Sequence, residues 1–270
     1  MSRRKLLQVL LVATWGLVPG ARTWGDEAPL HEVSQEVQAL RTLRQLKFTP
    51  EQMKALEKLA RETAQPARTH AKPKASAEYA QTLADLREAL ASDDADRADD
   101  LDEKLDQLTE SEKPEVDDGV ELTAAARKSV PEVLRALKPA QLAAFFGDNA
   151  DEVIDPQERL LATLDAVRAL KGNAWKEKRD EVAEEVARAL AGVDADRAER
   201  VHDQVVALLS KAHSLTDDEF NTRRTNLDKT ARQIAGNVGP VEVLQHQAEY
   251  ALAELLSNPR LAVVLKELLK

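Results

Sequence analysis

The chain has 270 residues, of which 48 are acidic and 38 basic, and its formal net charge at pH 7 is −10. This acidic balance disfavours nucleic acid and anionic lipid surfaces as partners, because both repel negative charge. The absence of cysteine excludes disulfides, thiolate metal sites, a cysteine nucleophile and a lipoprotein anchor.

The first 25 residues have the pattern of a secretory signal peptide. Residues 2–5 are Ser-Arg-Arg-Lys, residues 6–18 form an apolar core, and small residues follow at Gly20, Ala21 and Gly25. We expect cleavage after Ala21 or Gly25 and a mature protein in the periplasm or outside the cell. The arginine pair also fits twin-arginine export, but such pairs are common in ordinary signals, so the general secretory route is favoured. The apolar core is too short to span a bilayer comfortably, and no stable membrane insertion is expected after cleavage.

Apolar residues recur at spacings of three and four along much of the remaining chain, which is the period of an amphipathic helix. Such stripes lie within residues 33–46, 98–108, 160–170, 198–208 and 241–255. Aromatic residues make up only 3% of the chain, which also favours helices over sheets. No segment alternates apolar and polar residues for long enough to indicate a strand. The sequence therefore predicts an all-α fold.

One short motif marks a helix start with unusual clarity. In Phe48-Thr49-Pro50-Glu51-Gln52, Thr49 is placed to cap a helix, Pro50 to occupy its first position, and Gln52 to close a capping box. Related sequences are Leu137-Lys138-Pro139-Ala140-Gln141, which lacks the capping hydroxyl, and Leu215-Thr216-Asp217-Asp218-Glu219, which ends in glutamate.

At these residues the chain resembles the periplasmic Spy/CpxP-like proteins, whose mark is a Leu-Thr-x-x-Gln motif present twice. Phe48 stands at the first position of one copy, and Lys138 replaces threonine in the other. The resemblance implies an all-helical, ATP-independent chaperone or envelope-stress modulator that binds partners on a concave helical surface. Carried over to this chain, the motif implicates Thr49, Gln52 and Gln141 as structural caps.

Two segments 100 residues apart, Ala89–Ala98 and Ala189–Ala198, match at eight of ten positions. Each is predicted to contain a helix end, a tight turn and a helix start, with Asp94 and Asp194 as the N-terminal caps. A repeated helical hairpin predicts a multi-helix bundle of two related halves, arising from an internal duplication of about 100 residues.

The composition also suggests where the units begin and end. Residues 65–76 and 111–119 are expected to be connectors, and the two helical units are expected at 26–147 and 148–270. The C-terminal residues 255–270 have the highest apolar density after the signal region. We expect them to form a helix docked on the core, and the alternative is an amphipathic helix offered to a partner chain.

Residues 91–118 contain thirteen acidic side chains and three basic ones, which raises the question of a calcium site. The Asp-x-Asp-x-Asp-Gly loop with its closing glutamate is absent, so a solvated helix face is favoured. The run Asp148-Asn149-Ala150-Asp151-Glu152 is a second candidate, and a polar linker is the preferred interpretation there. No metal ligands are therefore assigned.

No pattern of catalytic residues emerges from the sequence. The five histidines, His31, His70, His202, His213 and His246, include no pair three or four residues apart on one helix. Nucleophile-elbow, dinucleotide-binding and phosphate-binding loops are also absent. No catalytic residue or cofactor is predicted, and the chain is expected not to be an enzyme.

We expect an exported binding protein that contacts other proteins or unfolded polypeptides, with a chaperone-like or stress-related role. A homodimer is an additional candidate assembly. A chaperone of this kind should expose an apolar patch rimmed by charge on its repeated unit. The alternative function is an envelope protein that responds to divalent cations through its carboxylates, and a hydrolase whose site forms only in three dimensions is a third hypothesis.

Overall fold

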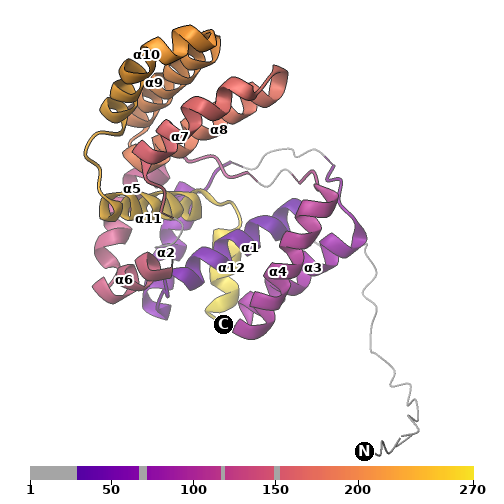
Figure 1. Cartoon of the computed structure of the whole chain (residues 1–270). Helices are drawn as coiled ribbons and strands as arrows, with labels where there is room; N and C mark the ends of the chain where they lie inside the picture. The colour runs from indigo at the N-terminus through magenta and orange to yellow at the C-terminus, as the bar shows by residue number, and fades with distance from the viewer. Residues whose placement is uncertain (1–28, 67–71, 117–118, 149–152) are drawn as a thin grey trace, which may run out of the picture.

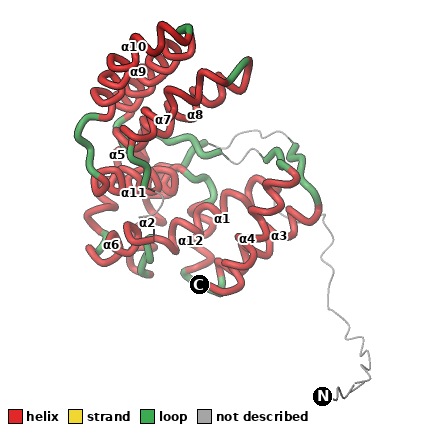
Figure 2. The backbone as a smooth tube through the Cα atoms, viewed as in Figure 1, coloured by secondary structure: helices red, strands yellow, loops and turns green. Residues whose placement is uncertain are grey.

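Helices account for the regular secondary structure of the computed structural model, which describes residues 29–66, 72–116, 119–148 and 153–270. Twelve helices and no strand occur in these ranges, so the all-α prediction is confirmed (Figures 1 and 2). The predicted signal peptide lies outside the described residues. None of the twelve helices is long and apolar enough to cross a membrane.

The helices in chain order are α1 (Leu30–Gln45), α2 (Pro50–Thr63), α3 (Ala77–Ala91), α4 (Ala95–Glu112), α5 (Ala124–Ala136), α6 (Pro139–Asp148), α7 (Pro156–Ala169), α8 (Gly172–Ala191), α9 (Ala195–Ser214), α10 (Asp217–Ala235), α11 (Pro240–Ser257) and α12 (Leu261–Leu268). A break at Asn258-Pro259 separates the last two helices. Where the structure describes residues 65–76 and 111–119, they lie between helices, except that residues 111 and 112 end α4.

The buried apolar side chains form two clusters. The first is built by α1–α6 together with α11 and α12, and the second by α7–α10. We expected residues 148–270 to form the second unit, whereas α11 and α12 return to the first cluster. The C-terminal helix is docked on the core as predicted, with Leu261, Val264 and Leu265 buried.

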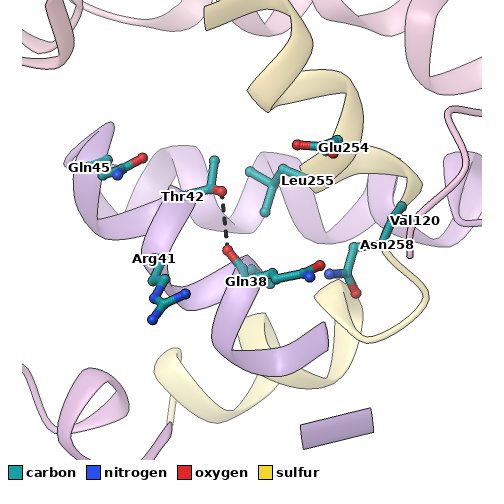
Figure 3. Close-up of a pocket in the computed structure, with 9 residues that line it drawn as sticks. Gln38, Arg41, Thr42, Gln45, Val120, Glu254, Leu255 and Asn258 are labelled. Carbon is teal, nitrogen blue, oxygen red and sulfur yellow. Dashed lines mark hydrogen bonds between the residues drawn. The ribbon is translucent and has the colours of Figure 1, made fainter. Parts of the chain in front are cut away.

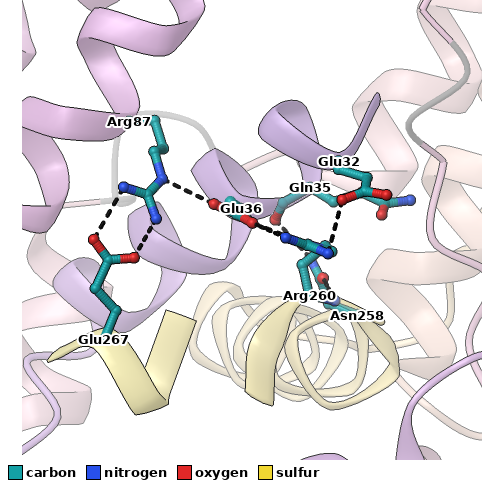
Figure 4. Close-up of polar contacts among 7 residues, drawn as sticks. All are labelled: Glu32, Gln35, Glu36, Arg87, Asn258, Arg260 and Glu267. Atoms are coloured by element: carbon teal, nitrogen blue, oxygen red, sulfur yellow. Dashed lines mark hydrogen bonds and ion pairs between the residues drawn. The ribbon is translucent and has the colours of Figure 1, made fainter. Parts of the chain in front are cut away.

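A buried carboxylate in α1 explains how the end of the chain is held against its beginning. The Glu36 side chain is only 5% exposed, and it accepts hydrogen bonds from Arg87 Nε of α3 at 2.8 Å and Arg260 Nε at 2.9 Å. Arg87 also pairs with Glu267 of α12, and Arg260 pairs with Glu32 (Figure 4). Because a buried charge is costly without partners, these contacts fix α1, α3 and the start of α12 together.

A second buried polar group orders the turn between α11 and α12. Asn258 Nδ2 donates to the backbone carbonyl of Gln35 at 2.8 Å, and its Oδ1 accepts from the backbone N–H of Arg260 at 2.8 Å. At the preceding position, the Ser257 carbonyl accepts from the backbone N–H of Gln65 at 2.7 Å. The end of α11 is therefore tied both to α1 and to the segment that follows α2.

Helix α11 also connects the two clusters, lying beside α5 and the C-terminal part of α8 (Figure 1). His246 Nδ1 lies 2.7 Å from the Ala189 carbonyl, at the end of α8. Arg127 of α5 donates to the Val193 carbonyl in the α8–α9 turn at 3.1 Å. The α7–α10 cluster is thus anchored chiefly through one end of α8.

The two hairpins that carry the sequence repeat, α3–α4 and α8–α9, start their second helices in the same way. Asp94 accepts a hydrogen bond from the backbone N–H of Arg97, and Asp194 accepts one from that of Arg197. Their turns differ, because the left-handed φ falls at Asp93 in the first and at Gly192 in the second. The hairpins also pack against different neighbours, so a duplication of about 100 residues stays a prediction.

Gly192 is constrained both by its backbone conformation and by its neighbours. A Cβ atom at Gly192 would lie 2.6 Å from Glu249 Oε2 and 3.0 Å from His246 Cδ2, whereas one at Gly236 would meet nothing within 4 Å. Both glycines have a positive φ that L-residues rarely adopt. Only Gly192 therefore combines the backbone requirement with close packing on α11.

We expect Gly192→Ala to destabilise the protein more than Gly236→Ala. Backbone strain should cost about 1–2 kcal/mol at either position, and displacement of His246 and Glu249 should add about 1 kcal/mol or more at Gly192. Urea unfolding of both variants measures the difference. Equal losses would show that the contact between the α8–α9 turn and α11 adds nothing to stability.

Candidate functional site

The capping motifs predicted from the sequence stand at the starts of α2 and α6. Thr49 Oγ1 accepts from the backbone N–H of Gln52 at 3.4 Å, and Gln52 Oε1 accepts from the backbone N–H of Thr49 at 2.8 Å. At α6, Gln141 Oε1 accepts from the backbone N–H of Lys138 at 2.9 Å. The second motif therefore keeps the glutamine half of the capping box, as its sequence allows.

The two glutamines, 89 residues apart, also contact each other. Gln52 Nε2 lies 3.0 Å from Gln141 Oε1, and Gln141 Nε2 lies 3.1 Å from Gln52 Oε1. Each amide also reaches the end of the helix that precedes the other motif. Gln52 donates to the Ala136 carbonyl at 2.8 Å, and Gln141 donates to the Leu46 and Lys47 carbonyls at 2.9 and 2.7 Å. These carbonyls lie at helix C-termini, where intrahelical partners are missing.

This glutamine pair fixes the backbone at the α1–α2 turn. Lys47 adopts a left-handed conformation with φ of 48°, which is unfavourable for a residue with a Cβ atom. Its carbonyl is held by Gln141, which is itself buried. The third motif, at α10, has the same local capping box between Thr216 and Glu219 but makes no contact with the glutamine pair. The backbone N–H of Thr216 lowers the pKa of the Glu219 carboxyl.

A polar cavity of about 300 Å³ lies between α1 and α11 (Figure 3). Four of its residues, Gln38, Arg41, Thr42 and Gln45, follow one face of α1 at helical spacing. The remaining lining residues are Ala39, Val120, Glu254, Leu255 and Asn258. These residues were not predicted as a site, although the helical spacing of the four polar residues on a face distinct from that of Val37 and Leu40 indicates a shared polar surface.

Glu254 is the carboxylate among the residues that line this cavity, and it is exposed. Surrounding protein nevertheless removes part of its hydration, which raises the pKa of the Glu254 carboxyl, and Arg188 offsets this only in part. Thr42 Oγ1 donates to the Gln38 carbonyl at 3.1 Å and is therefore not activated by any base. The cavity is suited to polar binding and lacks the hydroxyl–base contact of a nucleophilic site.

A second cavity, of about 370 Å³, lies between α9 and α10 and has a more apolar lining. Ala207, Leu208, Leu227 and Ile234 supply its apolar surface, and Gln204, Lys211, Thr230 and Gln233 complete the lining. Among the described residues, the exposed large apolar side chains are Val241 at 70% and Val263 at 42%. Neither belongs to a repeated hairpin, so neither contributes to the apolar patch rimmed by charge that was expected on that unit, and this patch stays a prediction.

Three of the histidines contact neighbouring groups that the structure describes. His213 stacks on Trp175 with ring centroids 4.1 Å apart, and its Nε2 lies 3.0 Å from the Leu170 carbonyl. His202 lies beside Asp203, and His246 contacts the end of α8. No group of three or more histidine, aspartate or glutamate side chains within the described ranges is arranged to hold a metal ion. His70 and residues 149–152 of the second acidic run lie outside those ranges.

No family model, no curated protein and no solved structure matches the chain. The likeness to Spy/CpxP-like proteins therefore rests on the motif residues alone. What the geometry adds to those residues is the direct contact between Gln52 and Gln141.

We expect Gln141→Ala to cost about 2–3 kcal/mol of stability and Gln52→Ala about 1 kcal/mol, because Gln141 is buried and leaves more backbone groups unpaired. The double variant should lose less than the sum, with a coupling of about 1 kcal/mol, since each change removes a contact of the other residue. Urea unfolding of the four proteins measures this cycle. Glu219→Ala, in the isolated capping box, is the control and should show no coupling to Gln141→Ala.

Glu254→Gln should stabilise the protein at pH 7. A raised pKa means that the folded state binds the proton more tightly than the unfolded state, so stability falls as pH rises from the ordinary glutamate pKa through the raised one. The variant escapes this loss, and its advantage should vanish below the ordinary glutamate pKa. Thermal unfolding across this pH range tests the effect, with Glu177→Gln on the exposed face of α8 as the control. An advantage that does not depend on pH would contradict the assignment.

Proposed function

We propose that this chain is an exported, non-enzymatic helical protein that binds other polypeptides in a chaperone-like manner. The contact between Gln52 and Gln141 carries the proposal. Capping boxes that arose independently as local helix signals would have no reason to meet across 89 residues. The two glutamines contact each other and together bind the carbonyls at the ends of two helices. The two copies of the motif therefore act jointly in the structure, as expected if the motif occurs twice for the same function.

The cavities favour binding over catalysis. The hydroxyls of Thr42 and Thr230, which line two of them, donate to backbone carbonyls within their own helices. The cavity between α9 and α10 presents the exposed Ala207 and the half-buried Ile234 to a client segment, whereas Leu208 and Leu227 in its lining are buried. Because large apolar side chains are otherwise scarcely exposed, we assign the apolar part of client binding to this cavity.

Suppression of the aggregation of a chemically unfolded client protein, measured by light scattering, tests the proposed function. The wild-type protein should suppress scattering without ATP. Ala207→Glu places a charge and added bulk in the apolar cavity, so it should weaken client affinity about tenfold, or about 1.4 kcal/mol. Ala162→Glu, at an exposed position of α7, should act like the wild type. A wild-type protein that leaves client aggregation unchanged would exclude the chaperone-like function.

A further inference from the structure

A third cavity separates α1 from α4 and has walls of opposite charge. It measures about 540 Å³ and is lined by Arg41, Arg44, Gln45, Lys47, Leu90, Asp99, Asp102 and Asp106. The basic residues belong to the end of α1 and the turn that follows, and the aspartates recur along one face of α4. We call this cavity the charged cleft.

One ion pair, between Arg41 and Asp102, crosses the charged cleft. The side chains of Arg44, Lys47, Asp99 and Asp106 form no hydrogen bond or ion pair within the part of the chain that the structure describes. Two basic and two acidic groups thus face one cavity without neutralising each other. Surface charges in this arrangement remain available to an incoming ligand that carries both signs.

Both walls are held by contacts outside the cleft. Lys47 keeps its left-handed backbone because Gln141 binds its carbonyl, and the carbonyl of Arg44 accepts from the backbone N–H of Lys47 at 3.0 Å. On the opposite wall, α4 is capped by Asp94 and anchored by the buried side chains of Ala98 and Leu105. Strained backbone that surrounding contacts maintain is characteristic of functional sites, because it places side chains before the ligand arrives.

We propose that the charged cleft binds a polypeptide segment in which an acidic and a basic side chain are close neighbours. The ligand's carboxylate would lie against Arg44 and Lys47, and its ammonium or guanidinium group against Asp99 and Asp106. A purely acidic segment would be repelled by one wall and a purely basic segment by the other. This inference rests on the proposed polypeptide binding and gives that function a charge preference.

Fluorescence anisotropy with labelled, end-blocked peptides tests the preference. The probe, called the dipolar peptide, has eight residues with adjacent glutamate and lysine in a background of glutamine and serine. Three comparison peptides carry only glutamate, only lysine, or no charged side chain. A fourth comparison peptide has no charged side chain but keeps its charged termini free. The dipolar peptide should bind at least about tenfold more tightly than each of the others, and added salt should weaken it. Equal binding of the free-terminus peptide would contradict recognition of side chains.

Variants assign the binding to the cleft. Two double variants should each lower the affinity for the dipolar peptide about tenfold. They are Arg44→Gln with Lys47→Asn, and Asp99→Asn with Asp106→Asn. Asparagine is chosen at position 47 because it tolerates the left-handed backbone. Because these side chains have no partner in the described structure, the urea midpoint should change little. The matched controls remove the same charge elsewhere, with Lys54→Gln plus Lys58→Gln on α2 and Asp100→Asn plus Glu110→Gln on α4. The controls should bind like the wild type.

The possible outcomes distinguish failure of the charged-cleft proposal from failure of the proposed chaperone-like function. Wild-type suppression of aggregation, with peptide binding unchanged in both cleft variants, would overturn the charged cleft and leave the proposed function standing. Equal losses in the controls would likewise overturn the cleft, because the effect would then follow net charge. Tight dipolar-peptide binding that the cleft variants weaken, without suppression of aggregation, would support the cleft and overturn the chaperone-like role.

Discussion

The carboxylate of Glu36 is the constraint on which the arrangement of the first cluster depends. A charge buried in the middle of α1 must be paired, and its partners, Arg87 and Arg260, come from α3 and from the residue before α12. Pairing with Arg260 requires the end of the chain to return to its beginning. This return places α11 across the molecule, and the α7–α10 cluster is attached through α11 and α8 (Figure 1).

Helix α1 therefore serves as core and as binding surface. Its apolar face, with Val37, Leu40 and Leu43, is buried in the first cluster. Its polar face lines the cavity that contains Glu254, and its basic end lines the charged cleft, with Arg41 and Gln45 shared by both. The Glu36 contacts hold the middle of this helix, and the Gln52–Gln141 pair holds its C-terminal end. The α1 residues that line both cavities are therefore positioned by the packed core.

Local features could be predicted from the sequence, and long-range partners could not. The caps at Thr49, Asp94 and Asp194 depend on residues only three positions apart, so their hydrogen bonds follow from local sequence. An apolar stripe such as that of α11 predicts that one face of the helix is buried. It does not predict which other helix packs against that face. For the same reason the sequence suggested a second unit through residue 270. The Gln52–Gln141 contact was missed because a capping glutamine is already explained by its own helix.

The net charge of the chain is an average over very different regions. Residues 77–112, which span α3 and α4, carry thirteen acidic side chains and three basic ones, a difference equal to the formal charge of −10 for the whole chain. The acidic hairpin thus faces a basic helix end across the charged cleft. Attraction between these walls would favour collapse, but the α1–α2 turn is held by Gln141 through the Lys47 carbonyl, and α4 is held by its buried contacts with α3. Gln141, which belongs to the motif that starts α6, therefore also holds the basic wall of the charged cleft away from the acidic wall. The separated charges remain available to a ligand.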